Sequence, residues 1–321
     1  MAFYDIFNGD ADGICALHQL RLHEPRAAEL VTGTKREIRL VERVVALAGD
    51  ELTVLDVSFD TNRAGVVKAL QAGARVRYFD HHFAGEIPSN ALLEAEIDTA
   101  ADVCTSLIVD RTLGGKYRAW AVVAAFGDNL SAAATQAAAP LGLAPHALAQ
   151  LQKLGECINY NAYGESVGDL HYHPVDLYRA LMPYADPLRF IAGEPVFEVL
   201  QEGMNDDLFR ASEARPHFED EHHALVLLPD AAWSRRVSGI LGNRLAQEHP
   251  SRAHAVLTAK PNGFLVSVRA PLVRPLGADT LCRQFESGGG RAGAGGINHL
   301  AASELERFTR AFRGAFDSPP G

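Results

Sequence analysis

The sequence predicts an α/β protein: a doubly wound, mainly parallel sheet followed by a smaller α/β domain. Two observations lead to this prediction. Short apolar runs alternate with helical stretches over the first part of the chain, the pattern of parallel strands joined by helices. A new α/β pattern starts at residue 224, and a length of 321 residues suits two domains of about 100–200 residues each.

The first domain, residues 1–192, opens with strands and helices in turn. Its first expected helix places Ile14, Leu17 and Leu20 on one face. A second helix ends at Gly73, and a later Ala-rich stretch keeps an apolar period that indicates helices. In chain order we expect a strand at 2–7, a helix at 13–23, a strand at 52–56, a helix at 63–72, a strand at 74–79 and mostly helix at 100–160.

A break at Gly193-Glu194-Pro195 leads into a charged helical connector, residues 193–223. The smaller domain then spans 224–321. Its expected strands are 224–228, 253–260 and 264–269. Asn262-Gly263 between the last two is a hairpin signal.

The composition is that of a globular protein, with 47% hydrophobic and 22% charged residues. The net charge of −10 is unevenly divided: residues 224–321 carry 12 Lys+Arg against 7 Asp+Glu, and residues 1–223 carry 18 against 33. The acidic part is suited to cations and the basic part to anions, although chance surface composition explains the division equally well.

Cysteine spacing and the N-terminal sequence indicate a cytoplasmic protein. The four cysteines lie far apart without a CxxC pair, which argues against a zinc ribbon or disulfide framework and for buried thiols. No apolar run approaches the ~20 residues of a membrane helix. The N-terminus has no basic region of the kind that opens a signal peptide, so we expect no membrane partner.

Acidic residues follow three of the expected strands. Asp10 and Asp12 come after the first, Asp56 ends the second, and Asp80-His81-His82 ends the third. Ligands of a doubly wound sheet bind outside the carboxyl ends of its strands, so these side chains should converge. Crowded carboxylates need a compensating cation, and oxygen ligands with an imidazole suit Mn²⁺ or Mg²⁺. A single Asp would be explained as a helix cap or turn residue.

The order NGDADG, LDVS, DHH and then Gly-Asp-Asn after a helix resembles the DHH phosphoesterase superfamily. The glycine run at 288–296 resembles the signature of that superfamily's C-terminal DHHA1 domain. The resemblance covers nearly the whole chain, and size and layout are most similar to the short-oligonucleotide and pAp phosphoesterases. It implies a metal-binding DHH domain, a substrate-binding DHHA1-like domain, and an active site in the crevice between them.

The resemblance implies two metal ions, Mn²⁺ or Mg²⁺. It assigns Asp10 to metal one, Asp12 and Asp128 to metal two, Asp56 to a bridge between both, and His81 to a metal ligand.

Catalytic roles are implied for Asp56, Asp80 and His82, where Asp80 orients His81 and His82 points toward the substrate phosphate. One position departs from the family: Ile6 stands where a histidine often binds metal one, and it has no donor atom. The amide oxygen of Asn8 is a candidate replacement.

The expected substrate-binding groups of the second domain are glycines and arginines. Backbone N–H groups of Gly288, Gly289 and Gly290 can cradle a phosphate. Arg291 stands where the family has a histidine, and Arg269 matches a substrate-contacting arginine of the family. Both can bind phosphate through charge-assisted hydrogen bonds.

Three other groups are open to two interpretations. His171 and His173 alternate and either bind a metal or have no such role, the interpretation we favour because no acid or Cys stands at ligand spacing. Thr34-Lys35-Arg36 is either part of an entrance for anions or a solvated basic turn. Asn159, Tyr160 and Tyr163 either contact a base or pack in the core, and we favour core packing.

The expected function is two-metal hydrolysis of phosphate esters in short oligonucleotides or nucleotides, with no long duplex nucleic acid as partner because the protein is acidic. A cyclic-dinucleotide phosphodiesterase and a non-catalytic, degenerate DHH nucleotide-binding protein are the alternatives. The sequence leaves a homodimer open.

Overall fold

The computed structural model describes residues 1–317, which divide into two compact units, Met1–Glu202 and Gly203 to the C-terminus. The division falls inside one helix, α9 (Pro195–Ser212). Among the described residues, no helix combines the length and the apolar character that spanning a bilayer requires.

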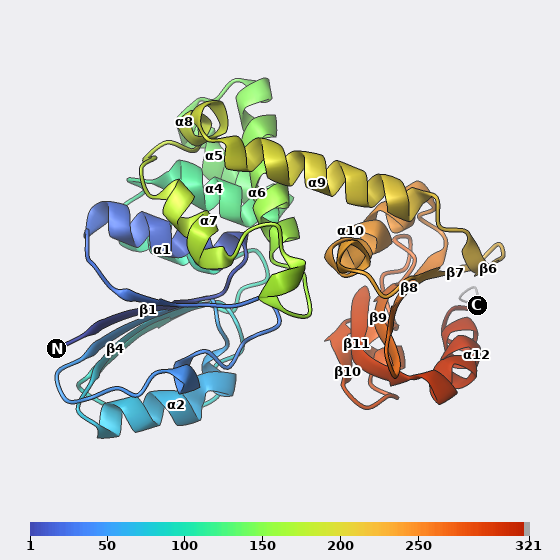
Figure 1. Ribbon diagram of the computed structural model, residues 1–321, viewed down its shortest axis with the longest axis horizontal. Helices are drawn as coiled ribbons and strands as arrows, with labels where there is room; N and C mark the ends of the chain where they lie inside the picture. Colours follow the sequence, from blue (N-terminus) through green and yellow to red (C-terminus); the bar gives the residue numbers. More distant parts are fainter. Residues whose placement is uncertain (318–321) are drawn as a thin grey trace. The chain divides into compact units, whose positions relative to one another are not determined.

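The N-terminal unit contains a five-stranded sheet in the order β2-β1-β3-β4-β5, with every pair parallel. Helices α1, α4 and α6 lie on one face of it and α2 on the other, which makes the sheet doubly wound (Figure 1). The strands are β1 (Phe3–Phe7), β2 (Glu29–Val31), β3 (Glu51–Leu55), β4 (Arg75–Asp80) and β5 (Leu93–Ile97). The helices before α9 are α1 (Ala11–His23), α2 (Phe59–Gln71), α3 (Thr105–Thr112), α4 (Arg118–Gly127), α5 (Ser131–Ala138), α6 (Pro145–Asn161), α7 (Pro174–Leu181) and α8 (Pro187–Gly193).

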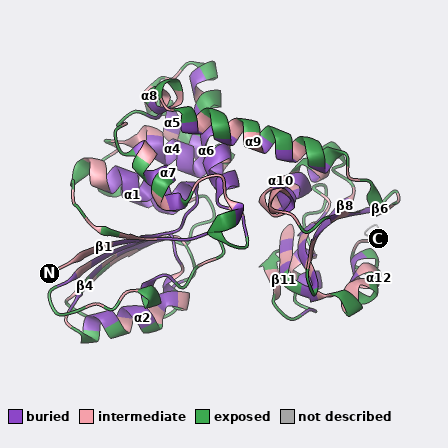
Figure 2. Ribbon diagram, viewed as in Figure 1, coloured by how far each residue is buried: buried purple, intermediate pink, exposed green. Residues whose placement is uncertain are grey.

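Burial follows this layering. Helix α4 is buried from Trp120 to Gly127 because other helices surround it, whereas α2 buries only one side (Figure 2). On the α2 face, Ile6, Val54 and Val76 from three adjacent strands join one apolar cluster. These strands are buried on both faces, as parallel strands usually are.

The strand order places a topological switch point between β1 and β3, since the chain runs outward in opposite directions from these two strands. Crevices at switch points, outside the carboxyl ends of the strands, are the usual ligand sites of such sheets. The segments that follow β1, β3 and β4 meet at this edge.

The C-terminal unit contains a six-stranded sheet in the order β10-β11-β9-β8-β7-β6. Only β7 and β8 pair in parallel, joined by α10, which packs on β8 and β9. An apolar cluster that includes Phe308 and Phe312 of α12 forms the core. The elements are β6 (Pro216–Glu219), β7 (His223–Leu228), α10 (Ala232–Glu248), β8 (Ala253–Lys260), β9 (Gly263–Arg269), α11 (Ala278–Cys282), β10 (Gly288–Arg291), β11 (Ala294–Ala301) and α12 (Leu305–Phe316).

The predicted fold class is confirmed, and the predicted strands and helices of the N-terminal domain lie where expected. Helix α2 starts four residues early because Ser58 Oγ accepts a hydrogen bond from the Thr61 N–H and caps it. One expectation is wrong: the connector is not helical throughout, because β6 at Pro216–Glu219 pairs with β7. The prediction of buried thiols is confirmed, since all four cysteines are free and buried.

Candidate metal centre

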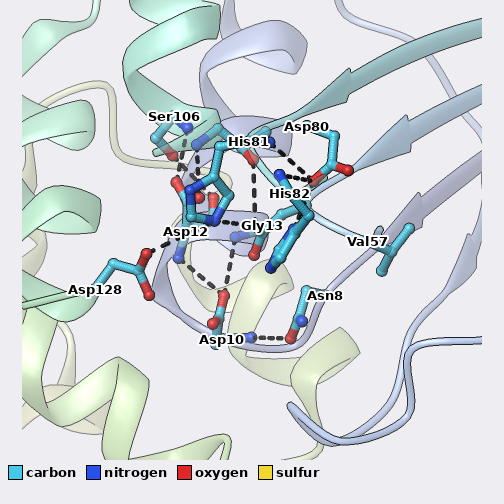
Figure 3. Close-up of polar contacts among 12 residues, drawn as sticks. Asn8, Asp10, Asp12, Gly13, Val57, Asp80, His81, His82, Ser106 and Asp128 are labelled. Atoms are coloured by element: carbon cyan, nitrogen blue, oxygen red, sulfur yellow. Dashed lines mark hydrogen bonds and ion pairs between the residues drawn. The ribbon is translucent and has the colours of Figure 1, made fainter. Parts of the chain in front are cut away.

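Asp10 and Asp12 follow β1 and open helix α1. Asp10 is the N-cap of this helix, and its Oδ1 accepts hydrogen bonds from the N–H groups of Asp12 and Gly13, both at 3.1 Å. A Cβ at Gly13 would lie 2.2 Å from the Asn8 carbonyl oxygen, so this turn requires glycine. The turn directs the Asp10 and Asp12 carboxylates to the carboxyl edge of the sheet (Figure 3).

Asp12 is held by the N-terminus of α3. Its Oδ2 accepts the Thr105 N–H and its Oδ1 accepts the Ser106 N–H, each at 2.7 Å. The Ser106 hydroxyl also donates to the Asp12 carbonyl at 2.9 Å. Each carboxylate oxygen keeps a second lone pair, so a fixed Asp12 is still able to bind a cation.

Asp56 adopts a left-handed backbone conformation, φ 57°, directly after β3. Asp tolerates this region better than most residues, and such strain gathers at functional sites. The side chain is buried, accepts a hydrogen bond from the Thr105 hydroxyl at 3.2 Å, and places Oδ1 3.5 Å from His81 Nε2. Asp56 therefore lies beside Asp12 and His81, as expected for the carboxylate that follows β3.

His81 is oriented for metal binding. Its Nδ1 lies 2.9 Å from the Val103 carbonyl oxygen. A carbonyl only accepts, so Nδ1 carries the proton and the lone pair of the neutral ring is on Nε2. Nε2 faces Asp56 Oδ1 at 3.5 Å and Asp128 Oδ2 at 3.8 Å.

The His81 and Asp128 side chains complete a group that can hold an ion. Asp128 ends α4 as its C-cap. Ligand atoms of Asp12, His81 and Asp128 lie within 4.8 Å of one another, as do those of Asp56, His81 and His82. Figure 3 shows the Asp12, His81 and Asp128 side chains pointing toward one another.

Asp80 orients the ring of His82 rather than that of His81. Asp80 Oδ1 accepts from His82 Nδ1 at 2.6 Å and from the backbone N–H groups of His81 and His82 at 2.9 and 3.2 Å. Its Oδ2 accepts the Phe59 N–H at 3.1 Å. The expectation that Asp80 sets the His81 ring is therefore wrong, because the Val103 carbonyl already occupies the ring nitrogen that would be set.

The cluster carries excess negative charge. Burial raises the pKa of Asp56 well above its usual value, and the carboxylates of Asp12, Asp10 and Asp128 raise it further. Burial also raises the pKa of Asp12. Unpaired carboxylates gathered in this way are costly without a cation, and hard divalent ions with oxygen and imidazole ligands fit them.

The sequence did not predict the part that Lys35 plays here. Its Nζ lies 2.6 Å from Asp10 Oδ2, 3.1 Å from Asn159 Oδ1 and 3.3 Å from Asp128 Oδ1. Burial raises the pKa of Asp10, but the Lys35 ammonium and the hydrogen bonds with Asp56 and the Gly13 N–H together lower it by more, so the net shift is downward. Lys35 and Asn159 are thus part of the centre. Lys35 does not line an entrance for anions, and Asn159 contacts the lysine rather than only packing in the core.

Neither Ile6 nor Asn8 supplies the metal ligand that the family's histidine often provides. Ile6 is fully buried in the apolar cluster of the sheet. Asn8 Oδ1 lies 3.3 Å from the Asp10 N–H, so its amide oxygen serves the turn. The histidine missing from position 6 was the signal that another group completes this side of the centre.

Apart from His82, the predicted phosphate-binding residues lie in the C-terminal unit. Arg269 donates from Nε to Asn243 Oδ1 at 2.6 Å and from Nη2 to the Gly239 carbonyl at 3.2 Å, which links it to α10. Arg291 is exposed at the end of β10, the edge strand of its sheet. Their binding of phosphate stays a prediction.

The glycine run forms the β10–β11 hairpin. A Cβ at Gly288 would lie 1.8 Å from the Cys282 carbonyl oxygen, and Gly290 has φ 138°, so packing and turn geometry require these two glycines. Gly289 faces open space. The backbone of the run is therefore ordered as strand, and its role as a phosphate cradle stays a prediction.

Comparisons with solved structures identify the fold of the chain. Searches found no matching family model and no matching curated protein. Among solved structures, the chain is similar to a protein described as a member of the s1p family of ribosomal proteins with a DHH domain, with TM-score 0.64 and 12% identity over 98% of this chain and 86% of that one. The chain has the DHH fold.

Two further DHH-fold structures match along nearly the whole chain. The exonuclease RecJ bound to manganese has TM-score 0.59 and 17% identity over 99% of this chain and 91% of RecJ. The pGpG-specific phosphodiesterase PggH of Vibrio cholerae has TM-score 0.58 and 13% identity over 98% of this chain and 99% of PggH. The side chains that could hold an ion lie at the edge where the sheet brings β1, β3 and β4 to their carboxyl ends.

Proposed function

We propose that the protein is a metal-dependent phosphoesterase that hydrolyses phosphate esters of short oligonucleotides or nucleotides. The observation that carries the proposal is the convergence of Asp12, Asp56 and Asp128 around His81 at the switch edge of the sheet. A divalent ion bound there supplies charge to a phosphate oxygen and lowers the pKa of a bound water.

His82 is the residue we assign to the substrate. Asp80 fixes its Nδ1, which leaves Nε2 for a phosphate oxygen. Burial lowers the pKa of His82, but the hydrogen bond to Asp80 and the negative charges of Asp80, Asp12 and Asp128 together raise it by more, so the net shift is upward. When it is protonated, this ring beside Asp56 and His81 is suited to hold a phosphate oxygen or to donate a proton to the leaving oxygen.

Short substrates fit the charge and the comparisons. The net charge of −10 disfavours long nucleic acid at physiological salt. PggH, whose chain matches this one over 99% of its length, is a phosphodiesterase specific for the linear dinucleotide pGpG. Arg269, Arg291 and the glycine backbone at 288–290 are the groups that we propose bind substrate phosphates in the C-terminal unit.

A substrate panel with Mn²⁺ tests the proposal. The purified protein is incubated with pAp, pGpG, short oligonucleotides and a cyclic dinucleotide, each with Mn²⁺ or with a chelator. We expect hydrolysis of linear substrates that the chelator abolishes. The Asp12→Asn variant should lose it, and Asp60→Asn, a matched change at an exposed carboxylate, should retain it.

The alternatives give other results. Preference for the cyclic compound would make the protein a cyclic-dinucleotide phosphodiesterase. Nucleotide binding without turnover of any compound would make it a non-catalytic binding protein and overturn the proposal.

A further inference from the structure

We propose that the ammonium group of Lys35 permanently takes the place of metal one, so that the centre binds a single divalent ion. The inference deepens the proposed function and rests on it, since it concerns the same metal centre. It departs from the two-ion count that the sequence predicts by resemblance.

The contacts of Lys35 Nζ are those of a bound cation. Three oxygens surround it, from Asp10 at 2.6 Å, Asn159 at 3.1 Å and Asp128 at 3.3 Å. An ammonium group has three N–H donors, one for each of these oxygens. Two of the three acceptors, Asp10 and Asp128, are carboxylates that the sequence assigns to metal ions.

The backbone of Lys35 is fixed, which distinguishes it from a flexible surface lysine. Its N–H donates to the Ala162 carbonyl at the end of α6 at 3.0 Å, and the preceding Thr34 N–H donates to Glu37 Oε2 at 2.8 Å. The Lys35 side chain is 25% exposed. Burial lowers the pKa of Lys35, but Asp10, Tyr163 and Asp128 together raise it by more, so the net shift is upward.

The first metal position lacks other ligands as well. The family's histidine is replaced by Ile6, which lies in the apolar core, and the Asn8 oxygen faces the Asp10 N–H. A divalent ion beside Asp10 would have to displace the ammonium and then find Asp10, Asp56 and water as its partners. In the wild type such an ion competes with the ammonium; once the ammonium is removed, the oxygens of Asp10, Asn159 and Asp128 that now contact Nζ become available to the ion.

The second position keeps its ligands. Asp12, Asp56 and His81 make no contact with Lys35 Nζ among its three hydrogen bonds, and Asp128 presents Oδ1 to Lys35 and Oδ2 to His81. Asp128 thus joins the built-in cation to the ion-binding group. An ammonium can donate a hydrogen bond to a phosphate oxygen, so Lys35 also offers a contact that metal one would otherwise make.

The stoichiometry of Mn²⁺ binding tests the inference directly. Bound Mn²⁺ is counted by electron paramagnetic resonance for the full chain, for Lys35→Met and for Lys68→Met. Methionine keeps the length of the side chain and removes its charge, and Lys68 is an exposed lysine near the end of α2. We expect one ion per chain for the wild type and Lys68→Met, and two for Lys35→Met.

Two results would overturn the inference: two ions in the wild type, or one ion in both the wild type and Lys35→Met. Circular dichroism and thermal unfolding check that the variant folds, and Lys35→Gln is the second variant if it does not. The wild-type count alone remains decisive in that case.

The same proteins separate this inference from the proposed function. One bound ion in the wild type and two in Lys35→Met, without hydrolysis of any phosphate ester, would contradict the function and leave the lysine's role intact. Hydrolysis with two bound ions in the wild type would do the reverse. Absence of Mn²⁺ binding would contradict both.

Discussion

Asp80 offers a sharp test of how the centre is organised, because its carboxylate is fully buried and accepts four hydrogen bonds. Asp80→Asn keeps the shape and removes the charge. If the amide oxygen takes the place of Oδ1, the new NH₂ group takes the place of Oδ2. It then faces the Phe59 N–H, and neither of these two donors has an acceptor. A buried donor without a partner costs about 1–3 kcal/mol, so the free energy of unfolding should fall by that amount.

The larger effect of Asp80→Asn should be on His82. The Asp80 carboxylate is what raises the pKa of this ring, against the opposing effect of burial. With a neutral partner the pKa of His82 should fall. Loss of a charge-assisted hydrogen bond of about 2 kcal/mol corresponds to about a 30-fold drop in kcat/KM.

Three measurements examine the variant. NMR pH titration follows the His82 ring, Mn²⁺ binding follows the centre, and hydrolysis of a linear dinucleotide gives kcat/KM. Mn²⁺ binding should be retained, because the Val103 carbonyl orients His81. Asp60→Asn, at an exposed carboxylate, is the control. An unchanged His82 titration, or loss of Mn²⁺ with an unchanged titration, would refute the assignment of Asp80 to His82.

Three further predictions follow from the structure. Asp56→Ala should weaken Mn²⁺ binding by at least about 100-fold and abolish hydrolysis, while the circular dichroism spectrum stays native. Loss of a residue that only orients a metal ligand already weakens binding by about 10–100-fold, and loss of a ligand should cost at least as much. Normal turnover by this variant would contradict the assignment of Asp56 as a ligand. Arg291→Gln should lower kcat/KM by about 10–100-fold with Mn²⁺ binding unchanged, whereas Arg283→Gln, at another exposed arginine, should do neither; loss of metal by Arg291→Gln would oppose the assignment. Burial lowers the pKa of His18 from 6.5 to about 4. As the pH falls from 6.5 to 4, only the unfolded chain takes up this proton, so the free energy of unfolding should fall by about 3 kcal/mol over that range. Denaturant titrations of His18→Gln should lack this part of the pH dependence, and an equal pH slope in wild type and variant would contradict the prediction.

The sequence was informative where structure depends on local patterns. Alternating apolar runs and helices predicted the doubly wound sheet, and acids at strand ends predicted which carboxylates meet. The short strand β2 and the half-exposed edge strand β5 escaped prediction, since neither carries a long apolar run. The glycine run was not expected to be a strand, because glycine disfavours strands; here close packing such as that of Gly288 on Cys282 requires it.

The parts of the centre that the sequence missed depend on contacts between distant segments. Lys35 lies 25 residues from Asp10 and 124 from Asn159, and only the folded chain brings the three together. The orientation of the His81 ring could not be predicted either. It depends on the Val103 carbonyl, 22 residues from His81. Motif spacing identifies which residue types are present, whereas hydrogen-bond partners decide what each can do.

Anomalous scattering of Mn²⁺ in a crystal of the full chain tests the central claim most directly. The account predicts a single anomalous peak within coordination distance of Asp12, Asp56, His81 and Asp128, with Lys35 Nζ still on Asp10. A second peak beside Asp10, with the lysine displaced, would contradict the single-ion centre. No peak among the four ligands would contradict the metal centre itself.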